Sequence, residues 1–580
     1  MRWNLARYNN IMTRRILVAL LLCLYAAIAE AAPKPNIFLI TLDSTRADRM
    51  GFLGAGRKGL TPNLDRVARE AIVFQRAYAQ VPLTVPSHAT ILTGLYPQAH
   101  QVTDLGVALP ASLPYLPDLL HAQGYRTGAF VGSSLLDPRA GFAPGFGRGF
   151  DTYDVPHAVG QPENSPDHVL ESPADAVVRR ATAWLPQDHR APVFLWLNLH
   201  PGASSTYGEQ IAGFDAAIGR FVQVLKTRNL YDDALIVIAA DHGEAIGTHG
   251  EAMHGVFLYD DTIHVPLLLK LPRKQMAGLR VTMRVSLVDI AASVLGVAGV
   301  PVPPQMQGQS LLRIVKSSSN ADQPVYSRTD FPNLNFGWSA LESWRAGNYL
   351  LIRAPRPELY DLSADPGAAR NLADSRKAVF DTLAAQLENF DRRLSSGAAA
   401  GASSGLSSSE LQKLSSLGYV GLQRSTPRDA SGPSGSDPKD GIAVANRVQS
   451  AMAALLAGKP AQALPALERA IATQPNIYLA QYGLGLARIA QKEYAQAIEP
   501  LHKAIALRPD SALAHYAMGV AASHTADWNT AATHLEIAVA RLPESALAHE
   551  LLGEAYSRLG RNADAAREKS KAMQLRSQHS

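Results

Sequence analysis

The sequence predicts an α/β domain built on a central, mostly parallel sheet, followed by an all-helical solenoid. Two observations predict this arrangement. In the first two thirds of the chain, continuous apolar runs of the kind that form strands buried on both faces of a parallel sheet alternate with helical patterns. In the last part, Pro475, Pro509 and Pro543 recur every 34 residues, a period typical of stacked helix pairs. A chain of 580 residues is long enough to hold both domains.

The first 31 residues have the pattern of a secretory signal peptide. Four arginines precede the apolar run Ile16–Ala29, and a small-residue pattern, Ala29-Glu30-Ala31, follows it. We therefore expect cleavage near Ala31 and a secreted or periplasmic protein. The apolar run is short for a membrane span, so we expect no membrane span in the mature chain.

The composition excludes two classes of function. Removal of four Arg and one Glu with the leader lowers the formal charge from +5 to +2, which leaves no basic nucleic-acid footprint. The single cysteine, Cys23, lies in the leader, so the mature chain has no disulfide and no cysteine nucleophile.

Three apolar strands of the first domain end in residues that can bind a metal or move a proton. The carboxyl ends of parallel strands meet at one edge of a sheet, where ligands bind. Such endings predict a metal-dependent active site there. The strands and their ends are Pro35–Thr41 with Asp43, Pro192–Leu199 with His200, and Ala234–Ala240 with Asp241 and His242.

The stretch V-P-L-T-V-P-S-H-A-T-I-L-T-G, residues 81–94, supplies a candidate nucleophile. The pattern predicts a short helix over Ser87–Thr93 with Gly94 as its stop signal. Thr84 is then expected just ahead of a helix N-terminus, where free backbone N–H groups favour an anion. A hydroxyl group at this place is suited to attack a phosphate or sulfate ester.

The remaining elements complete the predicted architecture. A Ser-, Gly-, Ala- and Pro-rich stretch separates the two domains and reads as a flexible linker. The predicted domains are a catalytic domain over 33–395, the linker over 396–440 and the repeats over 441–580. Other predicted elements are helices starting at Thr61-Pro62, over Leu116–Gly124, over Glu209–Thr227 (which carries Asp215) and over Lys377–Leu394, and strands at Gly128–Gly132, Trp338–Trp344 and Tyr349–Ile352.

Several separated motifs give the first domain a family resemblance. It resembles the sulfatase branch of the alkaline phosphatase superfamily, and the last domain resembles tetratricopeptide repeats. The resemblance implies an alkaline-phosphatase-like sandwich, a small α+β subdomain that closes it, and a repeat groove that binds a protein or peptide partner. The motifs are N-I-F-L-I-T-L-D-S-T-R-A-D (36–48), T-P-N-L-D-R-V-A-R-E (61–70), P-S-H-A-T-I-L-T-G-L-Y-P (86–97), A-D-H-G-E (240–244), H-G-V-F-L-Y-D-D-T-I-H-V-P-L (254–267) and E-L-Y-D-L-S-A-D-P (358–366).

The chain departs from sulfatases at the nucleophile. Those enzymes carry Cys or Ser, then x-P-x-Arg, and convert the first residue to formylglycine; here these positions run from Thr84 to His88. Threonine cannot give that aldehyde because its Cβ bears a methyl group. The resemblance to threonine-dependent relatives therefore implies a phosphoester hydrolase or transferase without formylglycine.

The resemblance also implies a role for each site residue. Asp43, Thr84, Asp241 and His242 would hold a divalent metal, with zinc or manganese favoured over calcium because one ligand is an imidazole. Thr84 would be the nucleophile. His254 would steady the developing charge or bind a second metal, and His200 would protonate the leaving group.

Two alternatives remain open at this point. The domain could be a sulfuric ester hydrolase that works without formylglycine. It could also be a degenerate hydrolase attached to a repeat scaffold, since threonine-bearing relatives often have an aspartate two residues before the histidine that matches His200, and Asn198 stands there. We further expect the repeats to be dispensable for turnover of small substrates.

Overall fold

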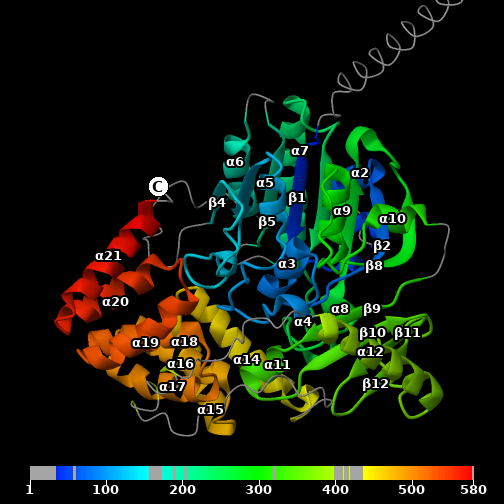
Figure 1. Ribbon diagram of the computed structural model, residues 1–580. Coiled ribbons are helices and arrows are strands. Elements are labelled where there is room, and N and C mark those ends of the chain that lie inside the picture. The colour runs from blue at the N-terminus through cyan, green and yellow to red at the C-terminus, as the bar shows by residue number, and fades with distance from the viewer. Residues whose placement is uncertain are drawn as a thin grey trace, which may run out of the picture. The chain divides into compact units, whose positions relative to one another are not determined.

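A mixed sheet of eight strands forms the centre of the first domain in the computed structural model (Figure 1). The structure describes residues 34–55, 60–155, 173–186, 191–201, 206–317, 322–397 and 435–577, together with 409–410, 414 and 417. The predicted leader, 1–31, and most of the predicted linker lie outside the described residues. The described residues from Asn36 onward form one compact unit.

The strand order of the large sheet is β4-β3-β5-β1-β6-β7-β2-β8. Neighbouring strands are parallel except β7, which is antiparallel to both β6 and β2. The strands are β1 (Ile37–Leu42), β2 (Ile72–Tyr78), β3 (Arg126–Val131), β4 (Thr152–Asp154), β5 (Val193–Leu199), β6 (Leu235–Ala240), β7 (His264–Lys270) and β8 (Arg280–Ser286).

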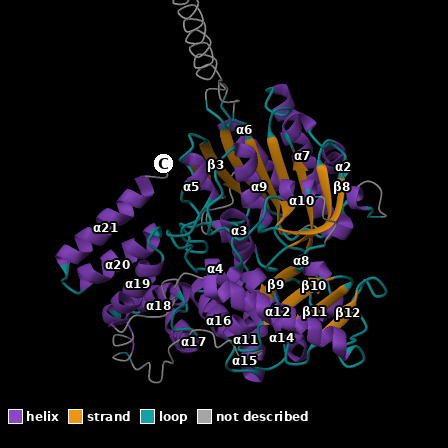
Figure 2. Ribbon diagram, turned by 45° about the vertical axis from the view of Figure 1, so that its right-hand side comes forward, coloured by secondary structure: helices purple, strands orange, loops and turns teal. Residues whose placement is uncertain are grey.

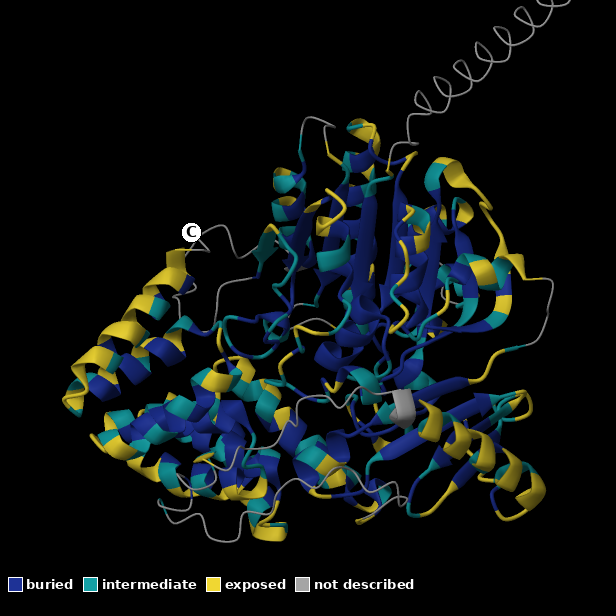
Figure 3. Ribbon diagram, viewed as in Figure 1, coloured by how far each residue is buried: buried dark blue, intermediate teal, exposed yellow. Residues whose placement is uncertain are grey.

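The register of β1 with its neighbours brings three strand ends to one level. Leu42, the last residue of β1, pairs with Leu199 of β5 on one side and with Ala240 of β6 on the other. The residues that follow each strand therefore meet at the carboxyl edge. Every residue of β1, β5 and β6 is buried, which accounts for their unbroken apolar sequences (Figure 3).

Two groups of helices pack with the sheet. One group brings α7 against α2 and α6, and the other brings together α3, α5 and α9. The mostly parallel α/β sandwich predicted from the sequence is confirmed. The helices of this domain are α2 (Pro62–Arg69), α3 (Thr84–Thr93), α4 (Pro97–His100), α5 (Leu116–His121), α6 (Pro173–Trp184), α7 (Tyr207–Thr227), α8 (Asp260–Ile263), α9 (Asp289–Ala298), α10 (Leu311–Lys316), α11 (Phe331–Phe336) and α12 (Lys377–Gly397).

A separate antiparallel sheet of four strands, order β12-β11-β10-β9, follows the large one (Figure 2). Helix α12 packs on β10 and β11. This confirms the predicted small α+β subdomain. Its strands are β9 (Val325–Thr329), β10 (Leu341–Ala346), β11 (Tyr349–Arg353) and β12 (Glu358–Asp361).

Eight helices in antiparallel pairs form the C-terminal region, and neighbouring helices contact one another along the series. The first of them begins at Pro438, inside the stretch predicted as linker, because the Asp437 side chain accepts the Lys439 N–H and caps it. None of the described helices is long and apolar enough to cross a membrane. The helices are α14 (Pro438–Leu456), α15 (Pro460–Thr473), α16 (Tyr478–Ala490), α17 (Tyr494–Leu507), α18 (Ala512–His524), α19 (Trp528–Arg541), α20 (Ala546–Arg558) and α21 (Asn562–Ser577).

Candidate active site

The carboxyl edge of the large sheet brings together three of the predicted metal ligands. Potential ligand atoms of Asp43, Asp241 and His242 all lie within 4.8 Å of one another, and all three residues are buried. Asp43 follows β1, and the other two follow β6.

Thr84 enters this group from helix α3. Its Oγ1 lies 3.3 Å from Nε2 of His242. The helix begins at Thr84 itself, one turn earlier than the predicted start at Ser87, because Pro86 in the first turn needs no backbone N–H partner. Gly94 ends it in a left-handed conformation, as predicted, and donates its N–H to the Thr90 carbonyl.

The protonation state of His242 follows from its contacts. Its Nδ1 lies 2.9 Å from the Gly243 carbonyl oxygen, which can only accept, so Nδ1 carries the proton. Burial and the charge of His254 lower the pKa of His242 to about 3. Nε2 is therefore an unprotonated nitrogen that points at Thr84, and the Thr84 hydroxyl donates to it.

The two carboxylates stand in unequal environments. Burial alone would raise the pKa of Asp43, but the adjacent His200, His242 and His254 outweigh burial and hold it well below its usual range. Burial and the charge of Asp43 raise the pKa of Asp241 well above its usual range. Asp241 Oδ1 accepts the Ser44 and His242 N–H groups, whereas its buried Oδ2 has no hydrogen-bond partner among the described residues.

These observations fit a divalent cation. A buried carboxylate oxygen without a partner costs free energy unless a cation or proton meets it. The unpaired Oδ2 of Asp241 lies 3.6 Å from His242 Nε2. Two carboxylates, one imidazole nitrogen and a hydroxyl form a mixed oxygen and nitrogen donor set for a divalent cation.

His200 and His254 lie beside different members of the group. His200 Nδ1 donates to Asp43 Oδ2, and the His200 side chain is 38% exposed. The His254 ring lies 4.4 Å from the His242 ring, and its Nδ1 donates to Glu244 Oε2 over 3.0 Å. Burial would lower the pKa of His254, but Glu244 and Asp43 raise it to about 9, so this ring is a cation at neutral pH.

His88 replaces the arginine of the sulfatase pattern with a neutral side chain. Its Nδ1 donates to the Thr84 carbonyl over 2.8 Å, so its Nε2 accepts from Thr41 Oγ1 over 2.9 Å. Burial lowers its pKa to about 4. His88 therefore braces α3 against β1 and provides no positive charge to a substrate.

Asp215, His249 and His264 make their contacts apart from the group. Asp215 accepts the N–H groups of Asn63 and Leu64, so it caps helix α2. His249 stacks on Tyr259, and His264 stacks on Tyr78.

Sequence reasoning missed two features of the site. Ser44 adopts a left-handed backbone, and its hydroxyl donates to Asp43 Oδ1 over 3.2 Å. Glu244 orients His254, a role that the A-D-H-G-E motif does not reveal by itself. The spacing of Glu244 two residues after a ligand pair was the available signal.

The comparisons with known proteins identify the first domain as that of an ester hydrolase of the sulfatase and alkaline phosphatase superfamily. Residues 35–300 match the sulfatase family, and residues 247–393 match the C-terminal part of N-sulphoglucosamine sulphohydrolase. Residues 448–512 and 516–574 match the tetratricopeptide repeat. The chain thus consists of a sulfatase-family domain followed by a tetratricopeptide-repeat domain, as the sequence motifs predicted.

Several relatives to which the chain is similar are sulfatases. The chain is 27% identical to an ulvan-active sulfatase of Formosa agariphila, over 61% of this chain and 80% of the relative. It is 23% identical to arylsulfatase K of Xenopus laevis, over 59% of this chain and 79% of the relative. The crystal structure of a phosphonate monoester hydrolase of Agrobacterium radiobacter matches with a TM-score of 0.54 at 22% identity, covering 62% of this chain and 96% of that one; it supports the fold alone.

Proposed function

We propose that the protein is a metal-dependent phosphoester hydrolase that attacks its substrate with the Thr84 hydroxyl. The observation that carries the proposal is the 3.3 Å approach of Thr84 Oγ1 to the unprotonated His242 Nε2 beside two buried carboxylates. A decayed site would have no physical reason to keep an unpaired buried carboxylate oxygen such as Asp241 Oδ2.

Asp43, Asp241, His242 and Thr84 would hold the cation, with zinc or manganese favoured. Such an ion supplies Lewis acidity, which lowers the pKa of the hydroxyl and neutralises charge on the ester oxygens. Asp43 suits this role because His200 engages one of its oxygens and leaves the other toward His242.

The chain's own residues account for the remaining steps. Thr84 Oγ1 forms a bond to phosphorus as its proton leaves to water, and the bond to the leaving oxygen breaks. His200, oriented by Asp43, donates a proton to that oxygen. The cationic His254, fixed by Glu244, steadies the negative charge that develops on the phosphoryl oxygens. Water, or an alcohol in a transferase, then attacks the phosphothreonine and restores Thr84.

The chemistry of Thr84 favours phosphorus over sulfur as the reacting atom. Formylglycine can release sulfate through its aldehyde hydrate, and threonine has no such group. The ester formed on Thr84 must therefore be cleaved by attack on its phosphorus or sulfur atom. The neutral His88 also removes the cation that the sulfatase pattern places beside the nucleophile.

A second candidate is a sulfuric ester hydrolase that works without formylglycine. The named relatives favour it, since they are sulfatases. We also propose that the chain is exported and cleaved near Ala31, which the N-terminal sequence of the protein recovered from the producing cell would test.

Turnover by the full mature chain distinguishes the candidates. We would supply zinc, manganese or calcium and compare bis(4-nitrophenyl) phosphate, 4-nitrophenyl phosphate and 4-nitrophenyl sulfate. We expect phosphoester turnover that falls about 1,000-fold or more in Thr84→Ala and largely survives in Thr84→Ser, with a phosphorylated residue 84 detectable by mass spectrometry. Sulfate turnover that persists in Thr84→Ala would contradict the mechanism. Absence of all turnover, with no metal by elemental analysis, would favour the scaffold alternative.

A further inference from the structure

The segment between Glu244 and Val256 has an irregular backbone that carries an active-site residue. Three glycines in it have positive φ, and so do Ile246 and His249, which are not glycine. Left-handed residues other than glycine cost free energy and persist where surrounding contacts hold them. We call this segment the His254 loop, because His254 lies near its end.

The loop has several backbone hydrogen bonds of its own, and those of Thr248, Gly250 and Glu251 form a tight turn in its outer part. Within it, Gly247 N–H donates to the Glu251 carbonyl and Ala245 N–H to the Met253 carbonyl. The buried Glu251 carboxylate accepts the N–H groups of Val256 and Phe257. These bonds leave the Gly250 carbonyl and the Ala252 N–H to be satisfied from outside the loop.

The first repeat-domain helix, α14, meets those peptide groups. The Asn446 side chain accepts the Ala252 N–H over 2.9 Å and donates to the Gly250 carbonyl over 2.8 Å, so one amide holds two points of the loop. One turn further along, Gln449 Nε2 donates to the carbonyl oxygen of His254 itself over 2.7 Å. Gln449 is 9% exposed.

Helix α14 is itself anchored firmly in the first domain. Ala445 and Val448 belong to the same buried apolar cluster as the large sheet. Gly441 lies flat against the Trp338 ring, where a Cβ atom would lie only 2.3 Å from ring atoms. Lys439 pairs with the buried Glu358 over 2.6 Å. A helix held in this way can act as a rigid support for the loop.

We propose that α14 positions the active site: Asn446 and Gln449 fix the His254 loop, and through it the His254 ring beside His242. They are positioning residues, because they contact backbone groups and not the reacting atoms. The proposal rests on the proposed function for the role of His254. It replaces our expectation that the repeats are dispensable, since the helix that makes these contacts opens the repeat domain.

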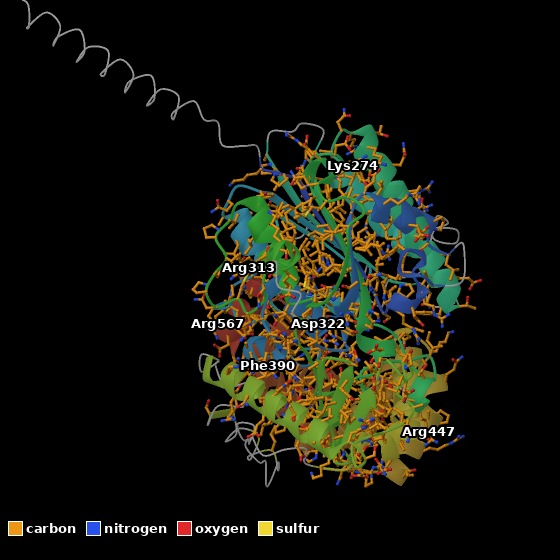
Figure 4. All side chains as sticks on the ribbon, turned by 90° about the vertical axis from the view of Figure 1, so that its right-hand side faces the viewer. Lys274, Arg313, Asp322, Phe390, Arg447 and Arg567 are labelled. Atoms are coloured by element: carbon orange, nitrogen blue, oxygen red, sulfur yellow. The ribbon has the colours of Figure 1, made fainter. Side chains whose placement is uncertain are left out.

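The test compares two variants of the full mature chain. Asn446→Ala/Gln449→Ala removes all three side-chain hydrogen bonds to the loop. In Arg447→Ala a neighbouring side chain of the same helix is removed; Figure 4 shows Arg447 projecting outward from α14. Amide hydrogen exchange of residues 245–256 measures the loop directly. Steady-state kinetics on the phosphodiester substrate measure the consequence. Gln449→Met, similar in shape but unable to donate, carries the test if the double variant does not fold.

We expect exchange in the loop to rise at least tenfold in the double variant, and kcat to fall about tenfold with KM within twofold. Arg447→Ala should match the wild type in both. Unchanged loop exchange would overturn the proposal, and so would faster exchange with an unchanged kcat. If the wild type turns over none of the substrates, the proposed function fails. The positioning is then tested by the rate at which diethyl pyrocarbonate modifies His254. An equal rate in the wild type and in the double variant would overturn the positioning proposal.

Discussion

The charge balance around Asp241 governs what the site can do. Asp43 has three histidines around it, whereas Asp241 has a carboxylate neighbour and an oxygen without a hydrogen-bond partner in the described part of the chain. The imbalance is removed when a cation lies between Asp241 and the His242 lone pair. Metal binding should therefore contribute to stability as well as to chemistry.

We predict that chelation lowers the thermal midpoint of the wild type. If the free ion concentration is about 100 times the Kd, removing the ion lowers the free energy of unfolding by about 3 kcal/mol, because the ion binds only the folded state. In Asp241→Asn the chelator should have little effect, since the uncompensated carboxylate is gone. Differential scanning fluorimetry with and without EDTA measures both shifts.

Asp233→Asn is a suitable control for this prediction. Asp233 is an exposed acid that pairs with Arg273 at the surface, and the variant should respond to EDTA as the wild type does. An equal response in Asp241→Asn would show that the stabilising ion is bound elsewhere.

The elements that position the site differ in how far the sequence predicts them. Strands β1, β5 and β6 are fully buried, so their unbroken apolar runs predicted both the strands and the meeting of their ends. Strand β8 (Arg280–Ser286) alternates exposed and buried residues at its start, and β2 closely follows α2. Neither sequence has the long unbroken apolar run that predicts a buried strand. The sequence does not predict the start of α3 at Thr84, because a proline near a helix start does not fix the exact boundary.

The repeat helices contain a buried histidine pair that makes stability depend on pH. His515 in α18 and His534 in α19 lie with their Nδ1 atoms 2.7 Å apart. His515 Nε2 donates to the Pro509 carbonyl over 2.9 Å, so His515 Nδ1 accepts and His534 Nδ1 donates. Burial lowers the pKa of His515 to about 4. Both rings are neutral at pH 7.

We predict that the chain loses stability as the pH falls from 6.5 toward 4, in part through this pair. The folded state binds fewer protons than the unfolded state in this range, so stability is full above pH 6.5 and declines below it. At pH 5 the part of this loss of unfolding free energy that comes from His515 is about 2 kcal/mol. In His515→Gln, which keeps a donor toward Pro509, the loss between pH 7 and pH 5 should be smaller by about that amount in urea unfolding. An equal loss in both chains would contradict the prediction.

At the scale of the whole molecule, the two domains share a continuous interface. Besides the contacts of α14, Arg508 pairs with Asp104 over 2.7 Å, and Asp104 also accepts from Asn335. The Glu544 side chain accepts the Gly145 N–H over 3.2 Å. The sequence predicted two domains joined by a flexible linker, and nothing in a repeat pattern reveals which outside surface the repeats touch. This interface could therefore be found only from the structure.

We predict that a chain ending near Arg393 does not behave as an independent enzyme. Without α14, the Trp338 ring loses its cover and the His254 loop loses its outer support, so the truncated domain should aggregate or show a lowered thermal midpoint and reduced turnover. A second truncation, after Gly458, retains α14 and should recover more of the activity. Light scattering, thermal unfolding and phosphodiester turnover of both chains check this. Full activity of the shorter chain would show that the catalytic domain does not need α14 or the repeats.

Two glycines of the first domain make room for leucines of the repeats. A Cβ atom on Gly106 would lie 2.9 Å from Leu513, and one on Gly141 would lie 3.0 Å from Leu542. Together with Asn446 and Arg508, these contacts draw on three successive repeats. A repeat inserted or deleted ahead of Leu513 would shift both leucines away from their glycines, whereas one added after Leu542 would leave these contacts in place. The contacts with the first domain thus constrain the number of repeats up to Leu542, and the end of the array beyond it is free of this constraint.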